Sequence, residues 1–260
     1  MDMIRSERLR TKIAIVTGAG SGIGRGCALM FARHGARVMA TDLDEQGLAE
    51  TSRLAVEEGL TIATLPSIDL TQEADVQRLV DTTVERFGQL NVLLNAGAWA
   101  AFEWIETMDY EKHWKRTLAS ELDVVFLACK LAWPHLKTSG AASIINFASA
   151  NAFVALSGSP ALAHCAGKGG VLAMTRQLAM EGAPHNIRAN SLCPGMVVTG
   201  ATRPVLENNP AIREAARTKT MLGRFGQPED VAWAAVFLAS DESSWVTAAD
   251  FSIDGGATAW

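Results

Sequence analysis

The chain has 260 residues, of which 48% are hydrophobic and 20% are charged, and its formal net charge at pH 7 is −5. This length suits one large α/β domain, and the hydrophobic content excludes a disordered or collagen-like chain. An acidic surface repels nucleic acid and anionic membranes, so neither is expected as a partner. The four cysteines lie far apart and form no C-x-x-C pair, which predicts reduced thiols in a cytoplasmic protein.

Residues 1–7 contain two acids and no apolar run, so a secretory signal is not expected. No uninterrupted apolar stretch approaches the roughly 18 residues of a membrane-spanning helix. The histidines other than His164 have no metal-ligand spacing, and the sequence therefore predicts no metal site.

Short apolar runs alternate with helical patterns along the whole chain. Strands are expected at 13–16, 37–41, 61–65, 91–94, 143–147, 187–192 and 251–253. Helices are expected at 22–34, 44–58, 75–87, 109–136, 162–181 and 229–239, the fourth of them ending near Pro134. Continuous apolar strands favour a parallel sheet that is covered on both faces. No linker divides the chain, so residues 1–260 are predicted to form a single α/β domain with a seven-stranded sheet.

The first expected strand runs into a glycine-rich turn. Glycines at 18, 22 and 24 follow the pattern T-G-x-x-x-G-x-G. Glycines allow the backbone to approach a pyrophosphate, and the helix that follows offers free N–H groups and the positive end of its dipole. Ser21 adds a hydroxyl donor. The alternative is a strand–helix turn of this composition with no ligand.

An acidic residue, Asp42, ends the second expected strand, 18 residues after Gly24. A carboxylate at this point can accept both hydroxyls of an adenosine ribose, and it repels a 2′-phosphate. The sequence therefore predicts NAD(H) as the cofactor rather than NADP(H). The alternative is a helix-capping role before Glu45, which suits either cofactor.

Several further motifs make the chain resemble the short-chain dehydrogenase/reductase family. They are Thr17 to Gly24, Asp69-Leu70, Asn95-Ala96-Gly97, Pro194-Gly195 with Thr199, residues 223–231 and Asp254-Gly255-Gly256. The resemblance covers residues 12–257. It implies a Rossmann-like, doubly wound sheet, a nicotinamide cofactor, hydride transfer on a carbonyl or an alcohol, and a dimer or tetramer.

The resemblance also implies roles for single positions. Asp69 matches the acid that meets the adenine amino group, residues 95–97 lie along the adenosine ribose, and residues 194–199 orient the nicotinamide carboxamide. Lys168 matches the lysine that holds the nicotinamide ribose, and Ser149 matches the serine that binds the substrate oxygen. Residues 196–222 match the segment that covers the substrate. The implied cofactor-binding set is Gly18, Ser21, Gly22, Ile23, Gly24, Asp42, Asp69, Leu70, Asn95, Ala96, Gly97, Lys168, Pro194, Gly195, Val197 and Thr199.

The catalytic positions depart from the family pattern. His164 stands where the family has its acid/base tyrosine, four residues before Lys168, and Glu121 stands where the family has an asparagine that supports a water chain. Imidazole has an ordinary pKa of about 6.5, so neutral histidine is a competent base for alcohol oxidation. Its reach is roughly 2 Å shorter than that of a phenol, which is large against a hydrogen-bond distance. Glu121 is expected either to accept a proton in the relay or to form a plain ion pair with Lys168 or another basic residue.

The sequence thus predicts an NAD-dependent oxidoreductase for a small alcohol or ketone, with Ser149, His164, Lys168 and Glu121 as catalytic residues. Two alternatives stay open: an NAD(H)-binding protein without catalysis, and an enzyme that uses His164 and Glu121 for elimination or hydration. Trp99, Phe102 and Trp104 are expected either to line an apolar substrate pocket or to pack in the core. Apolar residues on more than one face of helices 109–136 and 162–181 predict a homo-oligomer.

Overall fold

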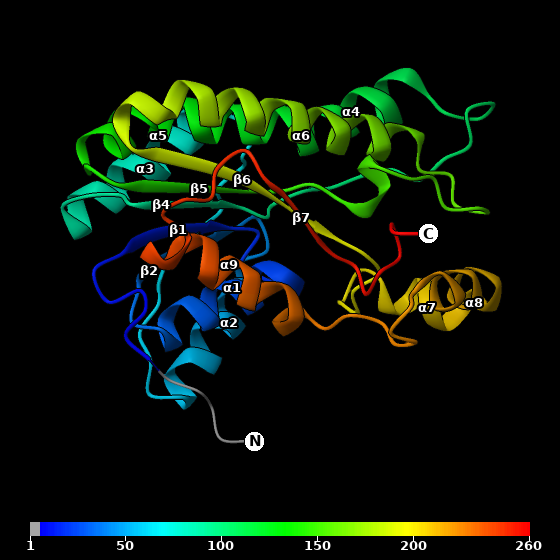
Figure 1. The fold of residues 1–260 in the computed structure, drawn as a ribbon, viewed down its shortest axis with the longest axis horizontal. Helices are drawn as coiled ribbons and strands as arrows, with labels where there is room; N and C mark the ends of the chain where they lie inside the picture. Colours follow the sequence, from blue (N-terminus) through cyan, green and yellow to red (C-terminus); the bar gives the residue numbers. More distant parts are fainter. Residues whose placement is uncertain (1–5) are drawn as a thin grey trace.

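The computed structural model describes residues 6–260. The first five residues, on which the expectation of no secretory signal partly rests, lie outside the described range. Seven parallel strands form one sheet in the order β3-β2-β1-β4-β5-β6-β7 (Figure 1). They are β1 (Ile13–Thr17), β2 (Arg37–Asp42), β3 (Ala63–Pro66), β4 (Val92–Asn95), β5 (Ala142–Phe147), β6 (Ile187–Pro194) and β7 (Asp250–Ile253). The predicted seven-stranded, Rossmann-like single domain is confirmed.

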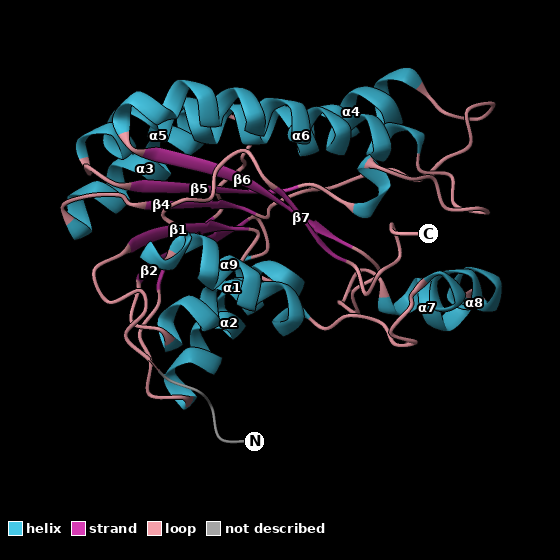
Figure 2. Ribbon diagram, viewed as in Figure 1, coloured by secondary structure: helices cyan, strands magenta, loops and turns pink. Residues whose placement is uncertain are grey.

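Helices cover both faces of the sheet (Figure 2). One layer holds α1 (Gly22–Arg33), α2 (Glu45–Glu57) and α9 (Pro228–Ala239), and the other holds α3 (Glu73–Phe87), α5 (Val124–Thr138) and α6 (Leu162–Gly182). The five residues of β1 are all buried. Because successive side chains point to opposite faces, Ala14 and Val16 enter one core while Ile15 enters the other.

The chain order reverses at the centre of the sheet. β1 pairs with β2 on one side and with β4 on the other, so the two halves of the sheet are wound in opposite directions from β1. Crossovers on the two sides leave a crevice outside the carboxyl ends of these strands, where open α/β sheets bind ligands. The fold therefore places the glycine turn after β1 and the segment after β4 at a binding crevice.

The long helical region after β4 differs from the expected single helix. It consists of the π-helical segments η1 (Tyr110–Lys115) and η2 (Ala119–Asp123), separated by α4 (Arg116–Leu118) and followed by α5. The predicted end near Pro134 is wrong, since α5 continues to Thr138. Ala132 and Leu136, on either side of the proline, are fully buried, and this packing holds the helix together across the missing N–H.

Residues 196–222 include two short helices, α7 (Arg203–Asn208) and α8 (Pro210–Lys219). They lie beyond the carboxyl end of β6 and apart from both helical layers (Figure 1). Asn209 begins α8 by accepting a hydrogen bond from the N–H of Ile212 at 3.1 Å. The substrate-covering role of this segment stays a prediction.

Within residues 6–260, no helix has both the length and the apolar character needed to cross a membrane. Across the same residues, no three His, Cys, Asp or Glu side chains gather closely enough to hold a metal ion.

Candidate active site

Glycines in the turn between β1 and α1 leave the backbone at the crevice without side chains. Gly18 has φ +66°, and a Cβ added to it would lie 2.7 Å from the Cα of Gly97. A Cβ on Gly24 would lie 2.0 Å from the carbonyl oxygen of Gly18. Only glycine fits either position, because one needs a left-handed backbone and the other has no room for a side chain.

The amino end of α1 is open to a ligand. Its first helical hydrogen bond runs from the N–H of Arg25 to the carbonyl of Ser21, at 3.1 Å. The preceding N–H groups therefore have no helical acceptor, and the hydroxyl of Ser21 makes no capping bond to them. Free N–H donors together with the positive end of the helix dipole make a site for an anion such as a diphosphate.

The ends of β1 and β4 are tied together below this turn. The Thr17 hydroxyl accepts hydrogen bonds from the N–H groups of Ala96 and Gly97, at 3.1 and 3.0 Å. A Cβ on Gly97 would lie 2.7 Å from the Leu70 side chain. The motifs after β1, β3 and β4, which lie far apart in the sequence, therefore form one surface.

Asp42 faces the glycine turn from the end of β2. Its two carboxylate oxygens accept hydrogen bonds from the N–H groups of Gly20 and Asp44, at 2.8 and 2.9 Å. Each oxygen keeps a further lone pair for a ligand hydroxyl. The cap of α2 is Asp44, which accepts from the N–H of Gly47, so the capping role considered for Asp42 belongs to its neighbour.

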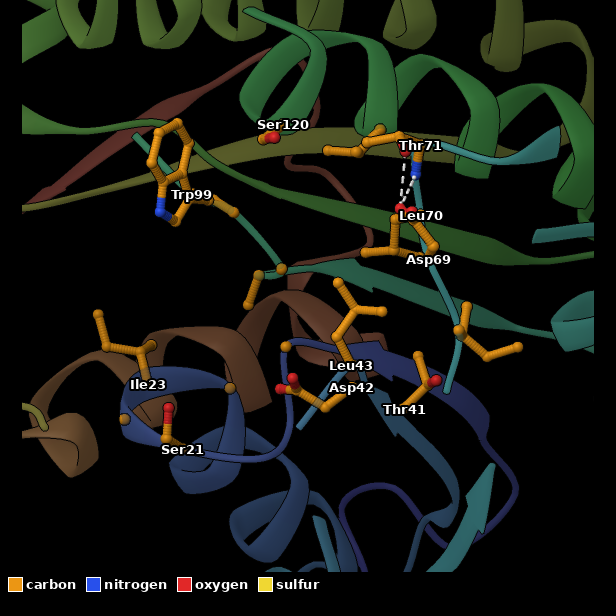
Figure 3. Close-up of a pocket in the computed structure, with 18 of the residues that line it drawn as sticks. Ser21, Ile23, Thr41, Asp42, Leu43, Asp69, Leu70, Thr71, Trp99 and Ser120 are labelled. Carbon is orange, nitrogen blue, oxygen red and sulfur yellow. Dashed lines mark hydrogen bonds between the residues drawn. The ribbon is translucent and has the colours of Figure 1, made fainter. Parts of the chain in front are cut away.

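A cleft of about 650 Å³ joins these groups. Figure 3 shows Ser21, Ile23 and Asp42 on one side and Leu70, Trp99 and Ser120 on the other. The predicted cofactor residues that line it are Gly18, Ser21, Gly22, Ile23, Gly24, Asp42, Asp69, Leu70, Ala96, Gly97 and Thr199. The lining residues without a predicted role are Thr41, Leu43, Ile68, Thr71, Ala98, Arg116, Ala119, Ser120 and Val124. Most of the latter adjoin the motifs, whereas those at 116–124 come from α4, η2 and α5, where the sequence predicted a catalytic role only for Glu121.

Other predicted cofactor residues lie outside the cleft lining. Asn95 is 3% exposed, and its side-chain amide donates to the Asn146 side chain at 2.9 Å, so it joins β4 to β5 beneath the crevice. Pro194 and Gly195 lie at the end of β6, and Val197 forms an isolated bridge with Gly226. Their contacts with a cofactor stay predictions.

Three of the predicted catalytic residues, Ser149, His164 and Glu121, form a connected chain of side chains. Nδ1 of His164, in α6, lies 2.6 Å from Oε1 of Glu121, in η2. Nε2 of the same ring lies 3.2 Å from Oγ of Ser149, which follows β5. Because Nε2 reaches Ser149, the shorter length of histidine does not separate it from the predicted substrate-binding serine.

Glu121 contacts a cation as well as the imidazole. Its carboxylate is 2% exposed, and Oε1 lies 3.8 Å from Nζ of Lys168. Lys168 is buried too and donates to the carbonyl of Phe147 at 3.0 Å. Burial lowers the pKa of Lys168 from its ordinary value, and the negative charge of Glu121 opposes that effect. Glu121 therefore lies within ion-pair distance of Lys168, and it lies closer to His164, a contact that the sequence did not predict.

Gly167 makes room for this buried carboxylate, although it carries no motif signal. A Cβ on Gly167 would lie 2.8 Å from Oε2 of Glu121 and 3.2 Å from its Cβ. Within the described residues, Oε2 has no hydrogen-bond partner. The absence of a side chain at Gly167 therefore leaves space for the large side chain of Glu121.

Two aromatic side chains flank the site. The Phe102 ring lies 5.4 Å from the His164 ring, centroid to centroid, and is 54% exposed. The Arg116 guanidinium stacks 3.9 Å above the ring of Trp99, which lines the cleft. Neither aromatic residue is in the core, so the apolar-pocket alternative is the one that these positions fit.

The chain is similar to known dehydrogenases and reductases over nearly its whole length. The family described as Enoyl-(Acyl carrier protein) reductase matches residues 18–258. The chain is 36% identical to 2-(S)-hydroxypropyl-CoM dehydrogenase 3 of Xanthobacter autotrophicus, over 98% of this chain and 99% of that protein. It is also 36% identical to the NADP-dependent (R)-specific alcohol dehydrogenase of Lentilactobacillus kefiri, again over 98% and 99%. The crystal structure of a putative short-chain dehydrogenase/reductase from Burkholderia xenovorans superimposes with a TM-score of 0.92, at 33% identity over 98% and 99% of the two chains.

Fold and site together define an oxidoreductase of the nicotinamide-dependent class. The chain belongs to the short-chain dehydrogenase/reductase family, over nearly its whole length.

The match between Gly167 and Glu121 can be tested by stability. Gly167→Ala is expected to lower the free energy of unfolding by about 1–3 kcal/mol, because the added Cβ overpacks the carboxylate. Gly169→Ala, on the same helix, is the control: no atom lies within 4 Å of its added Cβ, so it should be neutral or stabilising. In a Glu121→Asn background the cost of Gly167→Ala should fall. Equal costs in both backgrounds, measured by denaturant unfolding, would show that the two residues are independent.

Proposed function

We propose that this protein is an NAD(H)-dependent oxidoreductase that moves a hydride between nicotinamide and a secondary alcohol or ketone. The observation that carries the proposal is the Ser149–His164–Glu121 chain of contacts, in a fold whose crevice holds a diphosphate-binding turn. When bound, the nicotinamide supplies the hydride chemistry. The protein supplies binding, orientation and the movement of one proton.

The donor set of the cleft fits a dinucleotide. The free N–H groups at the start of α1 suit the diphosphate, and Asp42 suits an unphosphorylated ribose. The guanidinium of Arg25, on α1, is held by the carbonyls of Gly20 and Gly47 and by the hydroxyl of Thr51. A carboxylate at the ribose position and an arginine engaged by the backbone both support NAD(H) over NADP(H).

The proton is moved by the imidazole. An Nδ1–H donated to Glu121 leaves the lone pair of Nε2 directed at Ser149. A substrate oxygen bound by Ser149 therefore lies near a proton acceptor, and its hydroxyl proton passes to Nε2 directly or through one water. Lys168 holds the nicotinamide ribose and keeps a positive charge beside Glu121.

The remaining features of the proposal concern the whole molecule. Residues 1–260 act as one unit, in which residues 196–222 cover a small alcohol or ketone. The exposed Phe126 and Met180 support a homo-oligomer, since they leave apolar surface on α5 and α6. Four free cysteines fit the reducing cytoplasm.

Cofactor choice is the first prediction of this proposal. NADH should bind more tightly than NADPH, because the Asp42 carboxylate repels a 2′-phosphate. Asp42→Ala should narrow that preference by about tenfold, the change that corresponds to ~1.4 kcal/mol. Asp44→Ala is the matched control, since it removes a neighbouring carboxylate that does not line the cleft. Calorimetric titration measures both affinities, and tighter binding of NADPH by the unaltered protein would contradict the assignment.

Catalysis gives the second prediction. The protein should reduce NAD in the presence of a secondary alcohol from a broad panel, and His164→Gln should lower kcat by ~10²–10⁴-fold while NADH affinity is unchanged. His135→Gln, in α5, is the control and should keep full activity. If the His164→Gln variant kept full activity, a residue other than His164 would be the general base. NADH binding without turnover of any alcohol would instead favour the inactive or non-redox alternative.

A further inference from the structure

The contacts around His164 also meet the requirements of a different chemistry. A serine oxygen, both imidazole nitrogens and a carboxylate oxygen lie in series, with separations of 3.2 and 2.6 Å. We propose that Ser149, His164 and Glu121 form a nucleophile–base–carboxylate triad that transfers the acyl group of small, uncharged, activated esters. This activity needs no dinucleotide and goes beyond the proposed redox function.

Such a triad is recognised by geometry rather than by sequence order. The base must contact the nucleophile through one ring nitrogen and the orienting carboxylate through the other. Here the three residues come from separate elements: Ser149 follows β5, His164 lies in α6 and Glu121 lies in η2. One member therefore follows the end of a central strand, and the other two lie in helical segments packed beside it.

The carboxylate is suited to its part. Glu121 is almost fully buried, and its closest polar contact is Nδ1 of the imidazole. In a poorly solvated position this contact fixes the ring orientation and stabilises the imidazolium that forms when the serine loses its proton. Lys168, 3.8 Å away, balances the charge of Glu121 without contacting Ser149 in the described structure.

The serine oxygen has a further hydrogen bond. It accepts the N–H of Asn151 at 3.1 Å, as the cap of the short helix η3 (Ala150–Ala152). A hydrogen bond donated to this oxygen favours its deprotonated form. The same bond orients the side chain toward His164.

The surroundings select the class of ester. The half-exposed Phe102 ring lies beside the imidazole, and the charged members of the cluster, Glu121 and Lys168, are buried beneath it. An apolar acyl group can therefore rest on Phe102, whereas a charged one finds no exposed partner among these residues. An activated ester suits the site because its phenolate leaves without assistance from an acid.

The proposed reaction balances without any redox partner. Oγ of Ser149 attacks the ester carbonyl carbon as its proton moves to Nε2 of His164. The bond from that carbon to the leaving oxygen then breaks, the phenolate leaves, and His164 gives its proton to the solvent, so that an acyl-serine and a neutral imidazole remain. Water attacks the acyl carbon, gives one proton to His164, and the serine oxygen leaves and takes up that proton, which releases the carboxylic acid.

The test uses the whole protein, free of dinucleotide, and p-nitrophenyl acetate. An initial release of about one nitrophenolate per chain is expected, followed by slower turnover, as acyl-enzyme chemistry predicts. Peptide mass mapping after acid quenching should find the acetyl group on Ser149. An acetyl group on His164 or on a lysine would overturn the proposal without the use of any variant.

Variants separate the three roles. Ser149→Ala and His164→Gln should each lower the acylation rate by ~10²-fold or more, while Ser157→Ala, at an exposed serine, and His135→Gln should not. Glu121 is a positioning residue, so Glu121→Gln should lower the acylation rate at saturating ester and leave KM unchanged. NADH titration checks that each variant is folded. An unchanged burst in Ser149→Ala overturns the proposal, and this result is independent of whether NAD is reduced by an alcohol.

Discussion

A carboxylate buried at Glu121 is the constraint on which the catalytic end of this protein depends. A buried charge is costly unless it is paired and hydrogen-bonded. Here His164 lies 2.6 Å away, Lys168 lies 3.8 Å away, and Gly167 leaves the necessary space. The departures from the family pattern at 121 and 164 are therefore one arrangement, for which Gly167 leaves space. The π-helical turn that contains Glu121 belongs to a kind of irregularity that is common at functional sites.

The cofactor half rests on a different constraint, the close approach of the strand ends. A Cβ on Gly18 would lie 2.7 Å from the Cα of Gly97, and the Thr17 hydroxyl accepts hydrogen bonds from both N–H groups that follow Asn95. This packing sets the floor of the crevice at the reversal of strand order. The glycine turn after β1 and the Ser149–His164–Glu121 chain thus lie on one fold and are held by different contacts.

Much of the fold can be predicted from local sequence patterns, because the continuous apolar strands and the glycines that end helices are visible in the sequence. Local sequence patterns predict the ends of helices and strands poorly where tertiary packing determines them. Strand β3 begins at Ala63 rather than residue 61, and Pro134 lies within α5 because its neighbours are buried. The motif residues that line the cleft can be predicted from the sequence, because each belongs to a recognisable motif. The bond between Asn95 and Asn146, the space beside Gly167 and the order of contacts at His164 join distant segments, so no local pattern reveals them.

The central claim is that Glu121 directs the free nitrogen of His164 toward Ser149. Nitrogen NMR of histidine-labelled protein, with the His164 signals assigned by comparison with His164→Gln, reports which ring nitrogen carries the proton in the neutral form. The account predicts a proton on Nδ1, facing Glu121, and a bare Nε2 facing Ser149. A neutral ring that carries its proton on Nε2 would contradict it.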